Sequence, residues 1–193
     1  MYSSKVQAER ALLAAARACT ERCIVFVLFK IDAETIAKEL HCPAHHSDMA
    51  LDERRHALNT WIATGGTIVA TSGLGAGIDV PDVRHVRFCC CFFSSLSSTG
   101  RVQIFHHVGS HDIVHYTQEI GRGGRDGQLC KATAFVCLSS LPHSASSFAT
   151  WAGTKGCRVA SLADVIDGSP ALPCYLNGRQ VSCDPCLQRD RGT

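Results

Sequence analysis

The chain has 193 residues, of which 46% are hydrophobic and 19% charged, and its formal net charge at pH 7 is +2. This composition is typical of a globular domain and excludes an intrinsically disordered chain. The net charge is too small to indicate nucleic-acid binding, so any such contact must come from local patches. No apolar run reaches the length of a membrane span and residues 1–10 are too polar for a signal peptide, so we expect a soluble intracellular protein.

The apolar patterning predicts helices that alternate with strands. Lys5–Arg17 is rich in Ala and Leu and predicts a helix. Cys23–Phe29 is a continuous apolar run, typical of a strand buried on both faces of a parallel sheet. We expect Asp32 to cap a helix that ends at Leu40. Further along, we expect a helix over Leu51–Ala63 ended by Gly65-Gly66, and strands over Thr67–Thr71, Val83–Cys91 and Ala132–Leu138. This order predicts an α/β fold with a parallel sheet, whose ligands gather at the carboxyl ends of the strands.

One polar stretch, residues 118–127, combines glycine with arginine. If it is helical, Gln118, Arg122 and Arg125 share one face, because they lie four and then three residues apart. The glycines at 121, 123 and 124 leave this face without bulk, so another surface can approach closely. Two guanidinium groups on such a platform suit a phosphate. The alternatives are a solvated turn or an arginine-glycine tract that binds RNA without sequence preference.

A second glycine-rich stretch runs from Thr71 to Asp79 and leaves a predicted strand. It resembles the fingerprint of dinucleotide-binding folds, but its spacing is G-x-G-x-G and Pro81 comes too early for the long helix that the fingerprint requires. We therefore reject that interpretation. A glycine-rich loop at the carboxyl end of a strand still suits backbone contacts to phosphate or nucleic acid.

Histidines and cysteines offer several candidate metal sites. Twelve cysteines without a secretion signal are more consistent with thiols and metal ligands than with disulfides. Cys183 and Cys186 form a C-x-x-C knuckle, and with Cys157 and Cys174 upstream they make a four-thiolate set of the structural zinc type. The alternative is a scatter of core cysteines. We expect the remaining candidates to be a surface loop (His45-His46), a histidine series broken by Gly109-Ser110 (His107, His111 and His115) and apolar packing (Cys89–Cys91).

Three segments resemble helicase motifs of the RecQ family in superfamily two. Thr71–Arg84 resembles motif V, Tyr116–Gly127 resembles motif VI, and Cys23–Phe29 with the helix after Asp32 is similar to motif IV. Their order agrees with the second RecA-like lobe of these enzymes. The resemblance to the family extends to a zinc-binding subdomain after that lobe, which opens with a similar Cys157-Arg158 helix. It implies a RecA-like parallel sheet flanked by helices and followed by a small helical zinc-binding subdomain.

The resemblance also implies a division of the chain and the roles of several residues. We expect an N-terminal linker helix over residues 1–20, the RecA-like domain over 21–140 and the zinc-binding subdomain over 141–193. Arg125 would be the arginine finger, beside Arg122 and Gln118. These three would meet ATP together with Asp79 and Gly77. Contacts to DNA are expected from Thr71, Gly73 and Gly75, and a structural zinc ion from Cys157, Cys174, Cys183 and Cys186.

The family's reaction is ATP-driven 3′-to-5′ unwinding of DNA, so the resemblance implies single-stranded or forked DNA as partner and a nuclear role in recombination and repair. The chain departs from the family because it contains neither G-x-x-x-x-G-K-[ST] nor an Asp-Glu pair placed for Mg²⁺. The first lobe is thus missing, and we expect ATP and Mg²⁺ only if one is supplied. The alternative is a non-enzymatic DNA- or protein-binding module or a gene remnant. Arg87–Val102 is low in complexity and is predicted to be an insertion, as an expansion or a retained intron.

Overall fold

The computed structural model describes residues 1–20, 22–75, 102–122, 131–169, 171–174, 176 and 183–191. The helices are α1 (Lys5–Arg17), α2 (Lys30–Leu40), α3 (Leu51–Thr64), α4 (Ile113–Ile120), α5 (Ser146–Gly153), α6 (Arg158–Asp167) and α7 (Asp184–Arg191). The strands are β1 (Arg22–Phe26), β2 (Ala44–His45), β3 (Thr67–Ala70), β4 (Val102–Val108) and β5 (Lys131–Val136). Short 3-10 turns are η1 (Ser72–Gly75), η2 (Leu138–Ser140) and η3 (His143–Ala145). The predicted strand over Val83–Cys91 lies outside the described residues, as does all of the predicted insertion except Val102.

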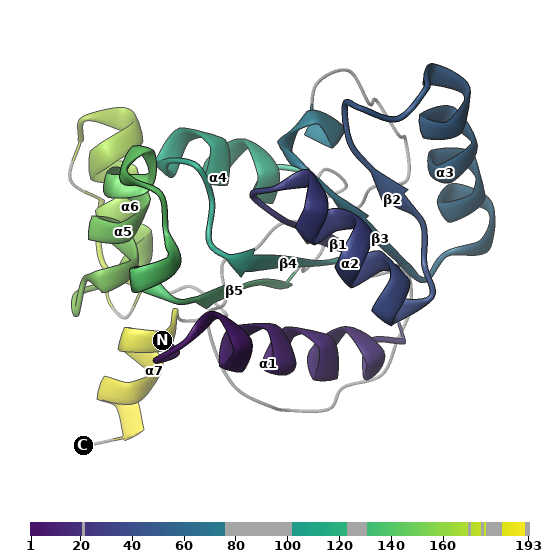
Figure 1. Cartoon of the computed structure of the whole chain (residues 1–193). Coiled ribbons are helices and arrows are strands. Elements are labelled where there is room, and N and C mark those ends of the chain that lie inside the picture. The colour runs from purple at the N-terminus through teal and green to yellow at the C-terminus, as the bar shows by residue number, and fades with distance from the viewer. Residues whose placement is uncertain are drawn as a thin grey trace.

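The described strands form one parallel sheet in the order β2-β3-β1-β4-β5 (Figure 1). In the central strand β1, Ile24 pairs with Ile68 on one side and Ile104 on the other. The chain moves from β1 to the β2 edge, returns through β3, and then crosses to β4. The strand order thus reverses around β1, which makes the carboxyl ends of β1, β3 and β4 the expected place for a ligand. The predicted parallel α/β sheet is confirmed.

Helices cover both faces of the sheet. Val25 and Phe105 pack with α1 and α2 on one face, whereas Ile24 and Phe26 pack with α3, α4 and α5 on the other. Figure 1 shows α1 and α4 on opposite sides of β4 and β5, and it shows α3 and α5 at opposite edges. This two-sided burial explains why the strands read as continuous apolar runs.

The helix α1 has the predicted bounds and packs against the sheet. Ser4 caps it by accepting a hydrogen bond from the backbone N–H of Gln7. Ala8 and Leu12 are fully buried, and burial of a leucine side chain stabilises a fold by roughly 1.5–3 kcal/mol. The backbone N–H of Tyr2 also donates to the carbonyl of Val136 in β5, 2.8 Å away. The helix that we expected to be a linker therefore contributes to the core, while the boundary at residue 20 stays a prediction.

Several local expectations need correction. The helix α2 begins at Lys30, and Asp32 lies in its first turn and binds Lys5 instead of capping the helix. His45 and His46 are buried and not on a surface loop. His45 belongs to the edge strand β2, and burial lowers its pKa.

The predicted end of α3 is confirmed, with Gly65 at its C-cap and a positive φ of 73° that favours glycine.

The strand β4 was not predicted. Its sequence, Val-Gln-Ile-Phe-His-His-Val, carries two histidines that break the apolar pattern, and both histidines are fully buried. They face opposite sides of the sheet, as period-two alternation requires. His107 lies in β4, His111 in a loop and His115 in α4, so the three do not share a helix. The expectation that Gly109-Ser110 break the histidine series agrees with this placement.

Candidate functional site

The loop after β3 lies at the carboxyl edge of the sheet. Thr71 is buried, and its backbone N–H donates to the carbonyl of His45 in β2. η1 follows, and the N–H of Leu74 donates to the carbonyl of Thr71. Gly73 is exposed, and among the described atoms a Cβ added there would meet only the Thr71 hydroxyl, 3.9 Å away. The described surroundings of Gly73 thus leave space for a ligand to approach the backbone closely.

The helix α4 brings the arginine-glycine stretch to the same edge. Its N-cap, Asp112, accepts a hydrogen bond from the backbone N–H of His115. The helix ends at Ile120, and the chain continues through a turn in which the N–H of Arg122 donates to the carbonyl of Glu119. Gln118 is exposed and Arg122 half-buried. Arg122 therefore lies just after the helix, and Arg125, the third residue of the expected face, lies outside the described residues.

The two glycine-rich segments meet in space. η1 contacts α4, and Leu74 shares one core cluster with Tyr116 and Ile120. Segments that lie more than 35 residues apart in sequence thus place Thr71, Gly73, Gln118 and Arg122 along one edge. The other predicted site residues of these segments, Gly77, Asp79 and Arg125, lie outside the described residues, as do the side-chain surroundings of Gly75.

Sequence reasoning missed a buried polar trio beneath this edge. Glu119 is 5% exposed, and its Oε2 lies 3.0 Å from Nε2 of His106 and 2.8 Å from Oγ of Ser110. The helical period offered a signal for it. Ile113, Tyr116 and Ile120 line the buried face of α4, and Glu119 falls three residues after Tyr116 on the same face.

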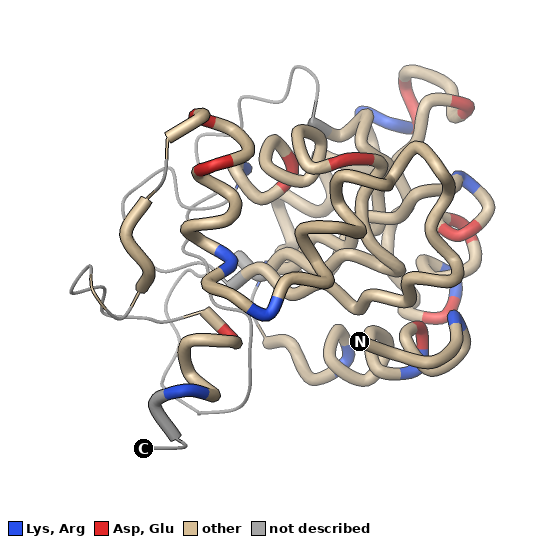
Figure 2. The backbone as a smooth tube through the Cα atoms, turned by 90° about the vertical axis from the view of Figure 1, so that its left-hand side faces the viewer, with Lys and Arg blue, Asp and Glu red and all other residues tan. Residues whose placement is uncertain are grey.

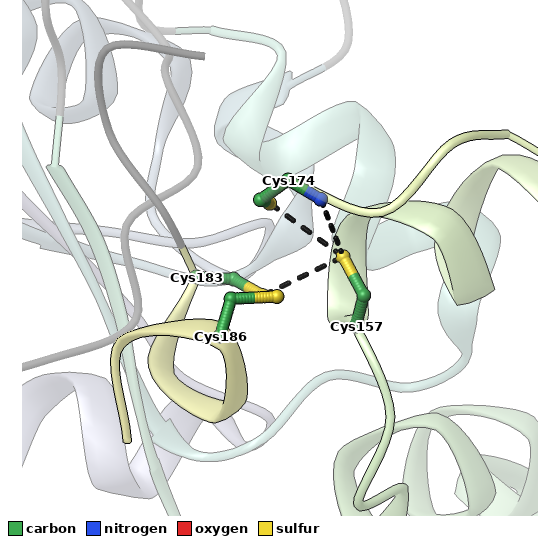
Figure 3. A group of neighbouring side chains, drawn as sticks. All are labelled: Cys157, Cys174, Cys183 and Cys186. Carbon is green, nitrogen blue, oxygen red and sulfur yellow. Dashed lines mark hydrogen bonds between the residues drawn. The ribbon is translucent and has the colours of Figure 1, made fainter. Parts of the chain in front are cut away.

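The four predicted cysteine ligands come together at the other end of the chain. Cys157 precedes α6, and Cys183 and Cys186 lie at the start of α7 (Figure 3). The sulfur of Cys157 is 3.5 Å from that of Cys174 and 3.7 Å from that of Cys183, and all four sulfurs lie within 4.8 Å of one another. Zinc–thiolate bonds of about 2.3 Å in a tetrahedron place sulfurs about 3.8 Å apart. All four are free thiols, so the cluster fits a tetrahedral metal ion of the zinc type.

The pKa values of these thiols indicate that a bound cation would supply the positive charge that the thiolates need. Burial raises the pKa of Cys174 to about 11, and it also raises the pKa of Cys186. Burial acts in the same direction on Cys157, but hydrogen bonds from the backbone N–H groups of Ala160 and Cys174 outweigh it and lower the pKa to about 7. Without a counter-charge, Cys157 therefore forms a thiolate more readily than Cys174 or Cys186. A divalent cation would stabilise all four as thiolates.

A salt bridge beside the cysteines ties them to the rest of the fold. Arg158 follows Cys157 and donates two hydrogen bonds, of 2.6 and 3.0 Å, to the carboxylate of Asp184, which follows Cys183. The same guanidinium donates to the carbonyls of Trp151 and Ala152 at the end of α5. The Trp151 ring lies 4.8 Å from the Tyr116 ring of α4. The cysteine cluster is thus linked to α4 through one arginine and one tryptophan.

Charge is not concentrated on one face of the described chain. Figure 2 shows Lys and Arg positions interspersed with Asp and Glu positions over the helices. The described positions show no broad basic face, and the local groups at the carboxyl edge remain the candidates for contact with nucleic acid. Among the described residues, no helix combines the length and apolarity that crossing a membrane requires.

Comparison with known proteins identifies the fold. The family model described as "Helicase conserved C-terminal domain" matches residues 4–127. The chain belongs to this helicase family. A Caenorhabditis elegans protein described as an ATP-dependent DNA helicase Q1 is 34% identical over 61% of the chain and 17% of its own length. The Arabidopsis thaliana "DEAD-box ATP-dependent RNA helicase 22" is 36% identical over 60% of the chain and 18% of its own length.

The helicase C-terminal fold also matches solved structures. Saccharomyces cerevisiae Dbp5, in a structure with RNA and ADP BeF3, aligns over 98% of this chain and 41% of its own with a TM-score of 0.57 and 15% identity. This likeness confirms the predicted RecA-like lobe. The chain aligns with less than a fifth of the curated helicases named above.

Proposed function

We propose that this helicase C-terminal domain is the second motor lobe, with an attached zinc-binding subdomain, of a RecQ-like 3′-to-5′ DNA helicase. The observation that carries the proposal is the meeting of η1 and α4 at the carboxyl edge of the sheet. The four-thiol cluster, linked to the same α4, favours a RecQ-like enzyme over an RNA helicase lobe. Its chemistry supports zinc as the ion, because four thiolates in a closed set are typical of structural zinc sites.

In the proposed reaction, ATP lies between this lobe and a first lobe that holds Mg²⁺. Arg125 acts as the arginine finger, and Arg122 and Gln118 bind the phosphates from the end of α4. Gly77 and Asp79 complete the nucleotide side, while Thr71, Gly73 and Gly75 contact the backbone of single-stranded or forked DNA. Phosphoryl transfer of this kind depends on positioning and charge stabilisation, which is what arginines on a fixed edge provide.

The proposed biological role is unwinding of DNA in recombination and repair in the nucleus. The 193 residues contain no G-x-x-x-x-G-K-[ST] phosphate loop, so we propose that they do not hydrolyse ATP by themselves. An arginine finger accelerates hydrolysis only of a nucleotide that is already clamped. The relatives include both DNA and RNA helicases, so the test must offer both nucleic acids.

The experiment is ATP hydrolysis by the bare chain and by a fusion to the first lobe of a DNA helicase Q1, with single-stranded DNA or RNA. We expect no turnover from the bare chain and DNA-stimulated turnover from the fusion. Arg125→Ala in the fusion should lower kcat about a thousandfold or more. Arg55→Ala, which removes an exposed arginine of α3, is the matched control and should leave kcat unchanged. Turnover by the bare chain, full activity of Arg125→Ala or stimulation by RNA alone would each contradict the proposal.

A further inference from the structure

The buried trio of His106, Ser110 and Glu119 joins the end of β4 and its following loop to the last turn of α4. The proposed function needs this last turn in a fixed position. His106 lies near the carboxyl end of β4, Ser110 lies in the loop that leaves it, and Glu119 lies in the last turn of α4. The three side chains are nearly or fully buried, at 0%, 1% and 5% exposure. A buried carboxylate requires partners, because desolvation of an unpaired charge is strongly unfavourable. One Glu119 oxygen meets both other residues.

The environment of the His106 ring fixes its orientation. The ring is stacked on Phe26 with 5.5 Å between centroids and lies 4.8 Å from Tyr116. Its Nδ1 is buried and has no hydrogen-bond partner among the described residues. Because Nδ1 has no acceptor there, the tautomer that fits carries its proton on Nε2, which donates to the Glu119 carboxylate.

The backbone between the two donors is strained. Val108 has a φ of 69°, a left-handed conformation that is unusual for a β-branched residue. Such a residue costs about 1–3 kcal/mol and persists only where its surroundings determine the conformation. His106 and Ser110 flank Val108 on either side, and both bind Glu119. The trio therefore links both sides of this strained residue to α4.

The neighbours of Glu119 are the residues with proposed contacts to phosphate. Gln118 precedes it and is exposed, and the carbonyl of Glu119 accepts the N–H of Arg122 at 3.2 Å. Rotation of the last turn of α4 would move both side chains away from the edge. We propose that Glu119, held by His106 and Ser110, is a positioning residue that fixes Gln118 and Arg122 for the nucleotide phosphates. This inference rests on the proposed function of the α4 segment.

The first test uses the bare chain and needs no activity. Hydrogen exchange at the backbone N–H of Arg122 should accelerate about tenfold or more in Glu119→Ala, because the turn loses its anchor. Glu119→Gln keeps the shape and one carbonyl acceptor, and it should restore most of the protection. Ile36→Val is the control, since it alters a buried side chain of α2 in the core on the opposite face of the sheet from α4, and it should leave this amide unchanged. Equal exchange in Glu119→Ala and the unsubstituted chain would overturn the proposal.

The second test measures kcat and KM for ATP in the fusion described above, well below the melting temperature of each variant. Glu119→Ala should lower kcat about tenfold or more with a smaller change in KM, and Glu119→Gln should recover most of the loss. Ile36→Val should lower the melting temperature and leave kcat unchanged. A parallel fall of kcat in Ile36→Val, or full kcat in Glu119→Ala, would overturn the positioning role. An inactive unsubstituted fusion would count against the proposed function alone, because the exchange result stands independently.

Discussion

Acidification should destabilise the fold through His107. This side chain is fully buried between the sheet and the layer of α1 and α2, and neither ring nitrogen makes a hydrogen bond among the described residues. Carboxylate oxygens of Glu9 and Asp32 lie 3.6 and 3.8 Å from the ring and favour the charged form. Burial opposes them and prevails, so the pKa of His107 is lowered to about 4, with Lys5 contributing in the same direction.

The sign follows from which state takes up the proton. Between pH 6.5 and pH 4 the unfolded chain binds a proton at residue 107 and the folded chain does not, so the free energy of unfolding falls as the pH falls. With an ordinary pKa of 6.5 and a folded value of about 4, the loss between pH 7 and pH 5 is about 2 kcal/mol. The stability that neutral His107 contributes is fully present above pH 6.5 and is lost as the pH falls from 6.5 towards 4.

The measurement is urea unfolding of the unsubstituted chain and His107→Leu at several values between pH 7 and pH 5. Leucine has a similar volume and does not titrate, so the variant should lose about 2 kcal/mol less over this interval. Other titrating groups and any loss of metal affect the unfolding free energies of both proteins equally, so they cancel in the difference. His56→Leu, at an exposed position of α3, should keep the full pH dependence. The same pH dependence in His107→Leu and the unsubstituted chain would refute this account.

Three further outcomes are expected. Purified protein should contain one zinc ion per chain by elemental analysis, and Cys183→Ala should lose it while Cys137→Ala keeps it; equal zinc in both variants would exclude the ligand set. Asp184→Asn weakens the salt bridge that supports the cluster and should lower zinc affinity about 10–100-fold in competition with a chelator, and unchanged affinity would remove that support role. Gly109→Ala should lower the free energy of unfolding by about 1–3 kcal/mol, because its Cβ would lie 2.6 Å from a ring carbon of α5 at a φ of +151°. Gly153→Ala, with no atom within 4 Å, should be neutral in the same denaturation assay.

The sequence predicts elements well where one physical signal dominates. Lys5–Arg17 was predicted with the bounds that α1 has, because Ala and Leu propensity and amphipathic spacing agree there. Gly65 was correctly predicted to end α3. β4 was missed because two adjacent histidines look polar, and only the fold reveals that each is buried on its own face. β2 has two residues, Ala44 and His45, which is too short for any periodic signal.

The candidate sites also differ in whether local sequence or tertiary packing determines them. The cysteine cluster follows from local spacing, because the C-x-x-C knuckle brings Cys183 and Cys186 together by itself. The trio around Glu119 depends on the packing of α4 over β4, which no local spacing encodes. Asp32 illustrates the opposite error. A residue with good capping chemistry binds Lys5 from another helix because tertiary contacts decide its partner.

Trp151 lies where its fluorescence would report a metal ion bound by the four cysteines. The chain has two tryptophans, and the guanidinium of Arg158 lies 5.6 Å from the Trp151 ring and reaches the cysteine segment. Its indole N–H donates to the carbonyl of Arg158. In a Trp61→Phe background, the emission spectrum would come from this one indole. Removal of a bound ion should then shift and quench the fluorescence. Metal occupancy could therefore be followed by Trp151 fluorescence during purification, titration or unfolding.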